Sequence, residues 1–112
     1  MIRVYIAGPL NGDAMEYLAN VNRFLEAERL LRRNGFAPYN PAADLLAGVY
    51  AGTLEYDDLA DANLAWLEVA DAIYVIARSP GADREVMRAY ERNIPVCWSL
   101  NDLRRQTMEV FL

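Results

Sequence analysis

Glu85 stands directly behind the turn Ser79-Pro80-Gly81, between a predicted strand and a predicted helix. Residues 72–76 are typical of a buried strand, and residues 82–92 are typical of a helix. Ligands of open α/β sheets bind where strands end and helices begin, so Glu85 is a candidate functional residue. The helix dipole favours its ionised form, which suits nucleophilic attack on a sugar carbon better than proton donation. The alternative is an acidic residue that only stabilises the first turn of a surface helix.

The composition limits the chemistry that is open to this chain. It contains no histidine, which removes imidazole acid–base catalysis and the commonest metal ligand. Cys97 is the single cysteine, so neither an intrachain disulfide nor a structural zinc site is expected. We expect no metal and no cofactor. Carboxylates, hydroxyls, amides and the backbone remain, and these groups suit glycosyl transfer better than acyl transfer or redox chemistry.

Length, charge and hydropathy indicate the broad class of protein. The chain has 112 residues, 54% of them apolar, which predicts a single domain over residues 1–112. Its net charge of −5 offers no electrostatic footprint for nucleic acid. No apolar run approaches the length of a membrane span, and the first predicted strand follows Met1 too closely for a signal peptide. We therefore expect a cytoplasmic protein that binds neither nucleic acid nor membrane.

Strand and helix patterns alternate along the chain. Strands are predicted at residues 2–7, 36–39, 72–76 and 95–98, and helices at 16–34, 56–70, 82–92 and from about 101. This alternation predicts an α/β fold with right-handed crossovers. The expected architecture is a flavodoxin- or Rossmann-like three-layer sandwich with a mostly parallel sheet of four or five strands. The first helix is expected to pack through the side that carries Leu18, Val21, Leu25 and Leu31.

Asn63 interrupts the apolar stripe of the helix predicted at residues 56–70. The residues that share its face at helical spacing are Leu59, Trp66, Leu67 and Ala70. An amide that faces inward must be hydrogen-bonded, since leaving it unpaired costs roughly 1–3 kcal/mol. Asn63 therefore either borders the core and bonds to a loop, or faces the same crevice as Glu85.

Three stretches occur in a recognisable order. They are residues 4–9 (VYIAGP), residues 63–71 (NLAWLEVAD) and residues 79–85 (SPGADRE), the last followed by Ala89 and by Ile94-Pro95-Val96. Together they resemble the nucleoside 2-deoxyribosyltransferase family and its deoxynucleoside 5′-monophosphate N-hydrolase relatives. A short branch of phage and bacterial proteins in this superfamily begins in a similar way.

The resemblance implies double displacement at an N-glycosidic bond. Glu85 matches the family's nucleophile, which attacks C1′ of a 2-deoxyribosyl group, displaces the base and passes the sugar to a second base or to water. Tyr5 matches a tyrosine whose hydroxyl positions the nucleophile; the alternative is an aromatic residue that packs in the core. Ser79 matches a serine that contacts the 5′ end of the ligand, and is otherwise a turn residue. With Glu85, Tyr5 and Asn63 as catalytic residues, the expected substrate-binding residues are Gly8, Pro9, Asn11, Ser79 and Gly81.

The sequence departs from the family pattern at several positions. Asn63 stands where the family has an aspartate associated with the leaving base, and an amide cannot transfer a proton. Asp83 and Arg84 replace a second glycine in front of the nucleophile. Pro9 and Asn11 stand where the monophosphate hydrolases have a serine and an arginine for phosphate. We therefore expect an uncharged 5′-hydroxyl to be preferred over a 5′-phosphate.

More than one function is compatible with these residues. The first is an enzyme that cleaves or transfers at the N-glycosidic bond of a (2-deoxy)nucleoside. The alternatives are a nucleoside- or nucleotide-binding protein with little or no activity, and a nucleoside 5′-monophosphate N-glycosidase. A flavodoxin-like interaction domain without a small ligand would give Glu85 and Asn63 no role.

Self-association is expected from apolar residues near the end of the chain and in one connection. They are Leu103, Met108, Val110, Phe111 and Leu112, and in the connection Leu46, Val49 and Tyr50. Exposed apolar patches mark interfaces, and the resemblance also implies dimers or higher oligomers. We expect at least a two-fold homodimer.

Overall fold

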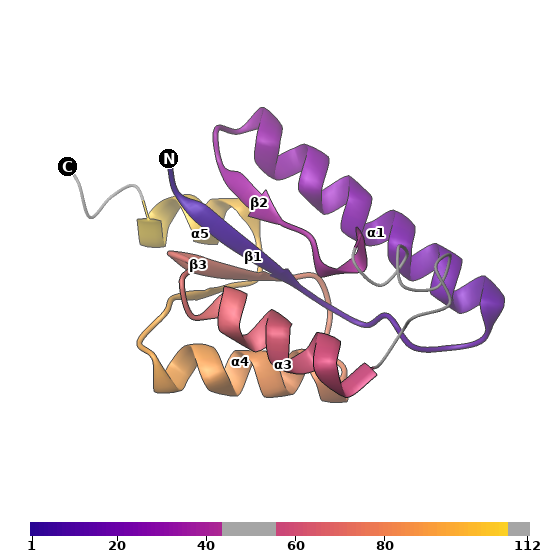
Figure 1. Ribbon diagram of the computed structural model, residues 1–112. Helices are drawn as coiled ribbons and strands as arrows, with labels where there is room; N and C mark the ends of the chain where they lie inside the picture. The colour runs from indigo at the N-terminus through magenta and orange to yellow at the C-terminus, as the bar shows by residue number, and fades with distance from the viewer. Residues whose placement is uncertain (44–55, 108–112) are drawn as a thin grey trace.

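The computed structural model describes residues 1–43 and 56–107, in which strands and helices alternate (Figure 1). The elements are β1 (Arg3–Ala7), α1 (Ala14–Arg33), β2 (Ala37–Tyr39), α3 (Tyr56–Leu67), β3 (Ala72–Val75), α4 (Pro80–Glu91), β4 (Val96–Cys97) and α5 (Leu100–Thr107). Every predicted strand and helix has a counterpart. The largest difference is at α3, which ends at Leu67 instead of residue 70; α1 begins at Ala14 instead of residue 16, and α4 at Pro80 instead of residue 82.

The four strands form one parallel sheet in the order β2-β1-β3-β4. This confirms the predicted α/β class. In the register of the sheet, Tyr5 on β1 lies opposite Tyr39 on β2 and Ile73 on β3. From β1 the chain runs through α1 to β2 at one edge, and from β2 it crosses through α3 to β3 on the other side of β1. The carboxyl ends of β1 and β3 therefore flank the topological switch point, where doubly wound folds bind ligands.

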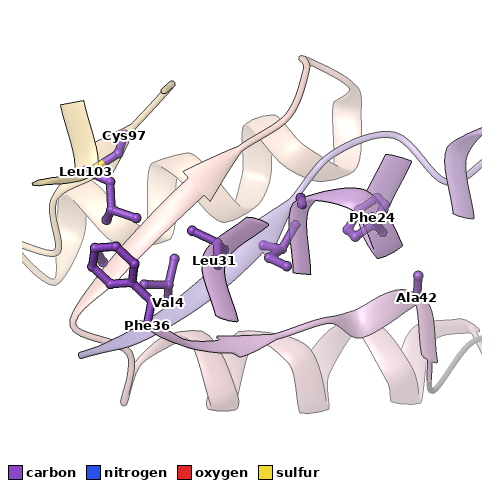
Figure 2. Close-up of a cluster of buried hydrophobic side chains, with 10 residues drawn as sticks. Val4, Phe24, Leu31, Phe36, Ala42, Cys97 and Leu103 are labelled. Atoms are coloured by element: carbon purple, nitrogen blue, oxygen red, sulfur yellow. The ribbon is translucent and has the colours of Figure 1, made fainter. Parts of the chain in front are cut away.

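Helices cover both faces of the sheet and give three layers (Figure 1). Alternate residues of β1 point to opposite faces: Val4 and Ile6 pack with Phe24 of α1, whereas Tyr5 and Ala7 belong to the core beneath α3 and α4. Figure 2 shows the first of these cores, with residues contributed from α1, the sheet and α5. The sheet thus places Tyr5 on the α3 and α4 side.

The buried face of α1 differs from the predicted one. Its buried residues are Val21, Phe24, Ala27 and Leu31, while Leu18 and Leu25 are 56% and 47% exposed. Phe24 and Ala27 define the centre of the contact with the sheet, so Leu18 and Leu25 fall on its flank. At the ends of the helix, the Asp13 side chain accepts a hydrogen bond from the Glu16 amide, and Gly35 follows the last turn with a φ of 85°.

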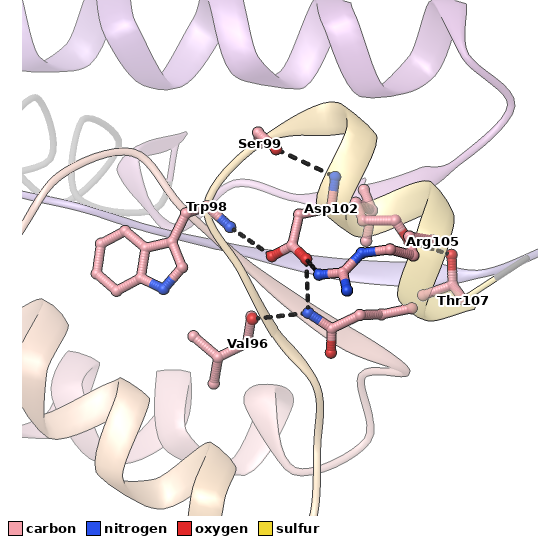
Figure 3. Close-up of polar contacts among 8 residues, drawn as sticks. Val96, Trp98, Ser99, Asp102, Arg105 and Thr107 are labelled. Atoms are coloured by element: carbon pink, nitrogen blue, oxygen red, sulfur yellow. Dashed lines mark hydrogen bonds and ion pairs between the residues drawn. The ribbon is translucent and has the colours of Figure 1, made fainter.

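At the far edge of the sheet, Asp102 ties α5 to the end of β4 (Figure 3). Its carboxylate accepts hydrogen bonds from the Trp98 amide (3.3 Å), from Gln106 (3.0 Å) and from Arg105. Gln106 also donates to the Val96 carbonyl at 3.1 Å. These bonds hold the pKa of Asp102 below its ordinary value.

Of the residues expected to promote self-association, Leu103 is buried in the core of its own chain. The others lie outside the described residues: Met108, Val110, Phe111 and Leu112, together with Leu46, Val49 and Tyr50.

Among the helices of the described segments, none combines the length and the apolar character that crossing a membrane requires.

Candidate functional site

A cavity of about 230 Å³ opens beside the carboxyl ends of β1 and β3. All eight residues selected from the sequence line this one pocket: Tyr5, Gly8, Pro9, Asn11, Asn63, Ser79, Gly81 and Glu85. The other lining residues are Leu10, Phe24, Pro41, Leu59, Ala60, Leu64, Pro80 and Arg84. The walls therefore come from the loop after β1, from α3 and from the start of α4, with further contributions from α1 and from the end of the β2 segment.

Glu85 lies in the second turn of α4, because the helix begins at Pro80 with Ser79 as its N-cap. Burial raises the pKa of Glu85 to about 7, against the lowering effects of a hydrogen bond from Tyr5 and of the charge on Arg84. With its pKa near neutrality, Glu85 is only partly ionised at pH 7, although the helix dipole was expected to favour the ionised form. The helix dipole acts mainly within the first turn, so desolvation decides the pKa.

Tyr5 is completely buried in the strand at the centre of the site. Its hydroxyl acts on the Glu85 carboxyl group and lowers the pKa of that group, and its ring stacks on Tyr39 with the ring centroids 5.5 Å apart. The Tyr5 side chain therefore packs in the core and also lines the pocket that contains Glu85.

The turn before α4 is held in shape by two polar contacts. The Ser79 hydroxyl oxygen accepts a hydrogen bond from the Ala82 amide at 3.0 Å, which leaves its O–H able to donate to a ligand. Arg78 donates to both carboxylate oxygens of Asp83, at 3.3 and 3.1 Å. Arg84 is exposed at the rim of the pocket and is its basic side chain.

Gly8 allows the chain to pass closely beneath the pocket. A Cβ at this position would lie 3.2 Å from the Cβ of Ile76 and 3.4 Å from the Phe24 ring. A side chain here would therefore press on the neighbouring strand segment and reduce the space available to a ligand.

Asn63 combines the two roles that the sequence left open. It lines the pocket together with Glu85, and its Oδ1 accepts a hydrogen bond from the Tyr39 hydroxyl at 3.3 Å. Trp66, expected on the inward face of α3, is 57% exposed and stacks on Tyr39 at 5.7 Å. Sequence reasoning missed Tyr39, although its place opposite Tyr5 follows once β1 and β2 are paired in register.

The polar side chains of the pocket define the chemistry that it can support. They are a carboxylate, amides, hydroxyls and a guanidinium, from Glu85, Asn11, Asn63, Tyr5, Ser79 and Arg84. In residues 1–43 and 56–107, no group of three or more His, Cys, Asp or Glu side chains is arranged to hold a metal ion. The arrangement offers one half-buried carboxyl group, able to act as a nucleophile or an acid, among hydrogen-bonding groups.

The fold and the pocket define a doubly wound α/β protein with a carboxylate at its switch-point crevice. The chain belongs to the family described as Domain of unknown function (DUF4406), whose model matches residues 2–98. No curated protein sequence matches it significantly.

Solved structures with a similar fold include the following two. A 2-deoxyribosyltransferase from the psychrotolerant bacterium Bacillus psychrosaccharolyticus is 25% identical with a TM-score of 0.64, and the match covers 84% of this chain and 69% of that one. A conserved protein from Enterococcus faecalis V583 is 24% identical with a TM-score of 0.60, over 86% of this chain and 61% of that one. The relationship to a 2-deoxyribosyltransferase is thus one of fold.

Proposed function

We propose that this protein cleaves or transfers at the N-glycosidic bond of a (2-deoxy)nucleoside through a covalent glycosyl-enzyme on Glu85. The observation that supports this most is that Tyr5 and Glu85 line one pocket, where the Tyr5 hydroxyl lowers the pKa of the Glu85 carboxyl group. The fold shared with a 2-deoxyribosyltransferase supports the same assignment and extends the family resemblance seen in the three sequence stretches.

In the first step, a carboxylate oxygen of Glu85 attacks C1′ as the bond from C1′ to the base nitrogen breaks. The bonding electron pair leaves with the base, which takes up a proton from water, because the Asn63 amide has none to transfer. In the second step, water or the nitrogen of another base attacks C1′ and releases Glu85 as a carboxylate. The incoming nucleophile loses its proton to solvent. Splitting one substitution into two lowers each barrier.

The remaining residues bind and orient the substrate in this proposal. Tyr5 fixes the carboxylate for attack, and Ser79 and Gly81 contact the sugar at the amino end of α4. Pro9 and Asn11 close the side formed by the first loop. The desolvated carboxylate is a stronger nucleophile once it is ionised, since no water shell has to be removed before attack.

The direct test is incubation of the protein with a panel of deoxynucleosides, with and without an acceptor base, followed by chromatography. Free base without acceptor indicates a hydrolase, and a new nucleoside indicates a transferase. Mass spectrometry of the intact protein should show one added deoxyribosyl group. Peptide mapping should then place that group on the peptide that contains Glu85. Glu91→Gln on the same helix, where Glu91 is exposed outside the pocket, serves as the matched control.

A second candidate is a nucleoside- or nucleotide-binding protein with little catalysis. The amide of Asn63 at the pocket favours this candidate, because no proton donor is available there for the departing base. Saturable binding of deoxynucleosides without release of base or labelling of Glu85 would select the binding protein over the enzyme.

A further inference from the structure

Tyr39 connects two of the pocket residues although it does not line the pocket itself. It is the last residue of β2, and it lies directly opposite Tyr5 in the parallel register of the sheet. Its ring stacks on Tyr5 at 5.5 Å with an angle of 20° between the planes, and on Trp66 at 5.7 Å and 22°. Tyr39 is therefore enclosed between two aromatic rings, which restricts its position.

The stack restricts Tyr5 in turn. The Tyr5 ring is completely buried, and Tyr5 lines the same pocket as Glu85, whose pKa the Tyr5 hydroxyl lowers. A ring that could tilt would carry the hydroxyl away from the carboxyl group and weaken this interaction, which depends on distance and direction. The edge strand β2 thus contributes to the placement of a hydroxyl that belongs to the neighbouring strand.

The hydroxyl of Tyr39 acts on the other side of the pocket. It donates to Oδ1 of Asn63 at 3.3 Å. A primary amide has one acceptor oxygen and one nitrogen with two N–H donors. With its oxygen engaged by Tyr39, Asn63 offers its nitrogen to a ligand, and the pocket favours a ligand with an acceptor atom at this position.

We propose that Tyr39 is a positioning residue with two separable functions. Its ring holds the Tyr5 hydroxyl on Glu85, and its hydroxyl fixes the Asn63 amide as a donor toward the ligand. The second function rests on the proposed nucleoside chemistry. The acceptor is then a ring nitrogen or carbonyl oxygen of the base adjacent to the glycosidic bond, as both purines and pyrimidines provide.

The two functions can be measured separately in the free protein. Tyr39→Phe keeps the stack and removes the hydroxyl, whereas Tyr39→Leu removes both, and Tyr90→Phe on the exposed side of α4 is the control. Nuclear magnetic resonance gives the order parameter of the Asn63 side-chain amide and the titration of the Glu85 carboxyl carbon. The charged and titratable groups that act on Glu85 are Tyr5 and Arg84, and all variants retain both.

We expect Tyr39→Phe to lower the Asn63 order parameter and to leave the Glu85 titration unchanged. Tyr39→Leu should also move the Glu85 midpoint to higher pH, because the lowering hydrogen bond from Tyr5 is lost. Unchanged Asn63 order in Tyr39→Phe would overturn the hydroxyl function, and an unchanged midpoint in Tyr39→Leu would overturn the ring function. If Tyr39→Leu does not fold, Tyr39→Met replaces it in this comparison.

Binding then tests the choice of ligand. A purine deoxynucleoside and its 3-deaza analogue differ in one acceptor, the ring nitrogen beside the glycosidic bond. The unchanged protein should bind the parent roughly 5- to 10-fold more tightly, as one hydrogen bond allows. Tyr39→Phe should reduce this preference to less than about 2-fold, and Asn63→Asp should abolish it.

Equal binding of the two compounds by the unchanged protein would refute the assignment of Asn63 as a hydrogen-bond donor to the ligand. If the Asn63 order parameter and the Glu85 midpoint change in the Tyr39 variants as expected but the protein binds no nucleoside, Tyr39 is a positioning residue and the proposed function is rejected.

Discussion

Tyr5 on the central strand β1 and Glu85 on α4 line the same pocket, and the Tyr5 hydroxyl lowers the pKa of the Glu85 carboxyl group. The two residues are 80 positions apart in the chain and meet at the wall of a single pocket. Burial raises the pKa of Glu85 and the Tyr5 bond opposes that rise. The balance between desolvation and this hydrogen bond determines how much of the carboxylate is ionised, and several predictions depend on it.

Substitution of Glu85 should abolish catalysis without unfolding the protein. Glu85→Gln removes the nucleophile but keeps the size of the side chain, so we expect glycosidic turnover to fall by on the order of 10³-fold or more. Chromatographic assays measure the loss, and circular dichroism checks the fold. Glu91→Gln should keep normal turnover. A Glu85→Gln variant with most of its activity would remove Glu85 from the mechanism.

The rate should rise with pH through neutrality. Attack requires ionised Glu85, and its pKa is raised to about 7, so kcat/KM should increase about tenfold per pH unit below that value. We expect an ascending limb with a midpoint near the Glu85 pKa, measured with a deoxynucleoside between weakly acidic and weakly basic pH. A flat profile across this range would contradict the assignment of Glu85 as the ionising group.

Tyr5→Phe should move that limb to higher pH. The hydrogen bond from Tyr5 lowers the pKa of Glu85, so its removal leaves desolvation less opposed and the protonated form more stable. The variant should lose most of its activity at neutral pH and recover part of it under alkaline conditions. An unchanged midpoint would show that the Tyr5 hydroxyl does not act on the carboxylate.

Stability should fall as the pH rises from about 4.5 to about 7. The pKa of Glu85 is raised from an ordinary 4.5 to about 7, so the folded state binds the proton more tightly than the unfolded state. The contribution of Glu85 to the free energy of unfolding is complete below about pH 4.5 and is lost as the pH rises through the pKa of the folded state. The change is on the order of 3 kcal/mol. Urea unfolding should show this loss for the native protein, and a smaller one for Glu85→Gln.

The 5′ end of the ligand should be uncharged. Pro9 and Asn11 line the pocket and carry no positive charge, which favours a deoxynucleoside over its monophosphate. The amino end of α4 and the exposed Arg84 would instead favour the monophosphate, since backbone amides and a guanidinium can bind phosphate. Calorimetry with the two ligands decides between them. Tighter binding of the monophosphate, lost again in Arg84→Ala, would reverse the expected preference.

Much of this architecture follows from local sequence signals. Short continuous apolar runs specify the strands, because the strands of a parallel sheet covered by helices are buried on both faces. Asp13 and Gly35 mark the ends of α1 through hydrogen bonding and backbone conformation that depend on a few neighbouring residues. The turn before Glu85 and the order of the strands then place the loop after β1 beside the start of α4. For this reason the residues chosen from the sequence come together in one pocket.

The tertiary structure alone decided the properties that depend on environment. The pKa of Glu85 is set by the groups that exclude water from it, and these come from separate elements. The helical pattern of α1 suggested a face with Leu18 and Leu25, but the sheet selects the face centred on Phe24. Tyr39 gains its contacts with Tyr5 and Asn63 only when two strands pair in register and α3 packs across them. Long-range contacts of this kind are not determined by the spacing of residues along the chain.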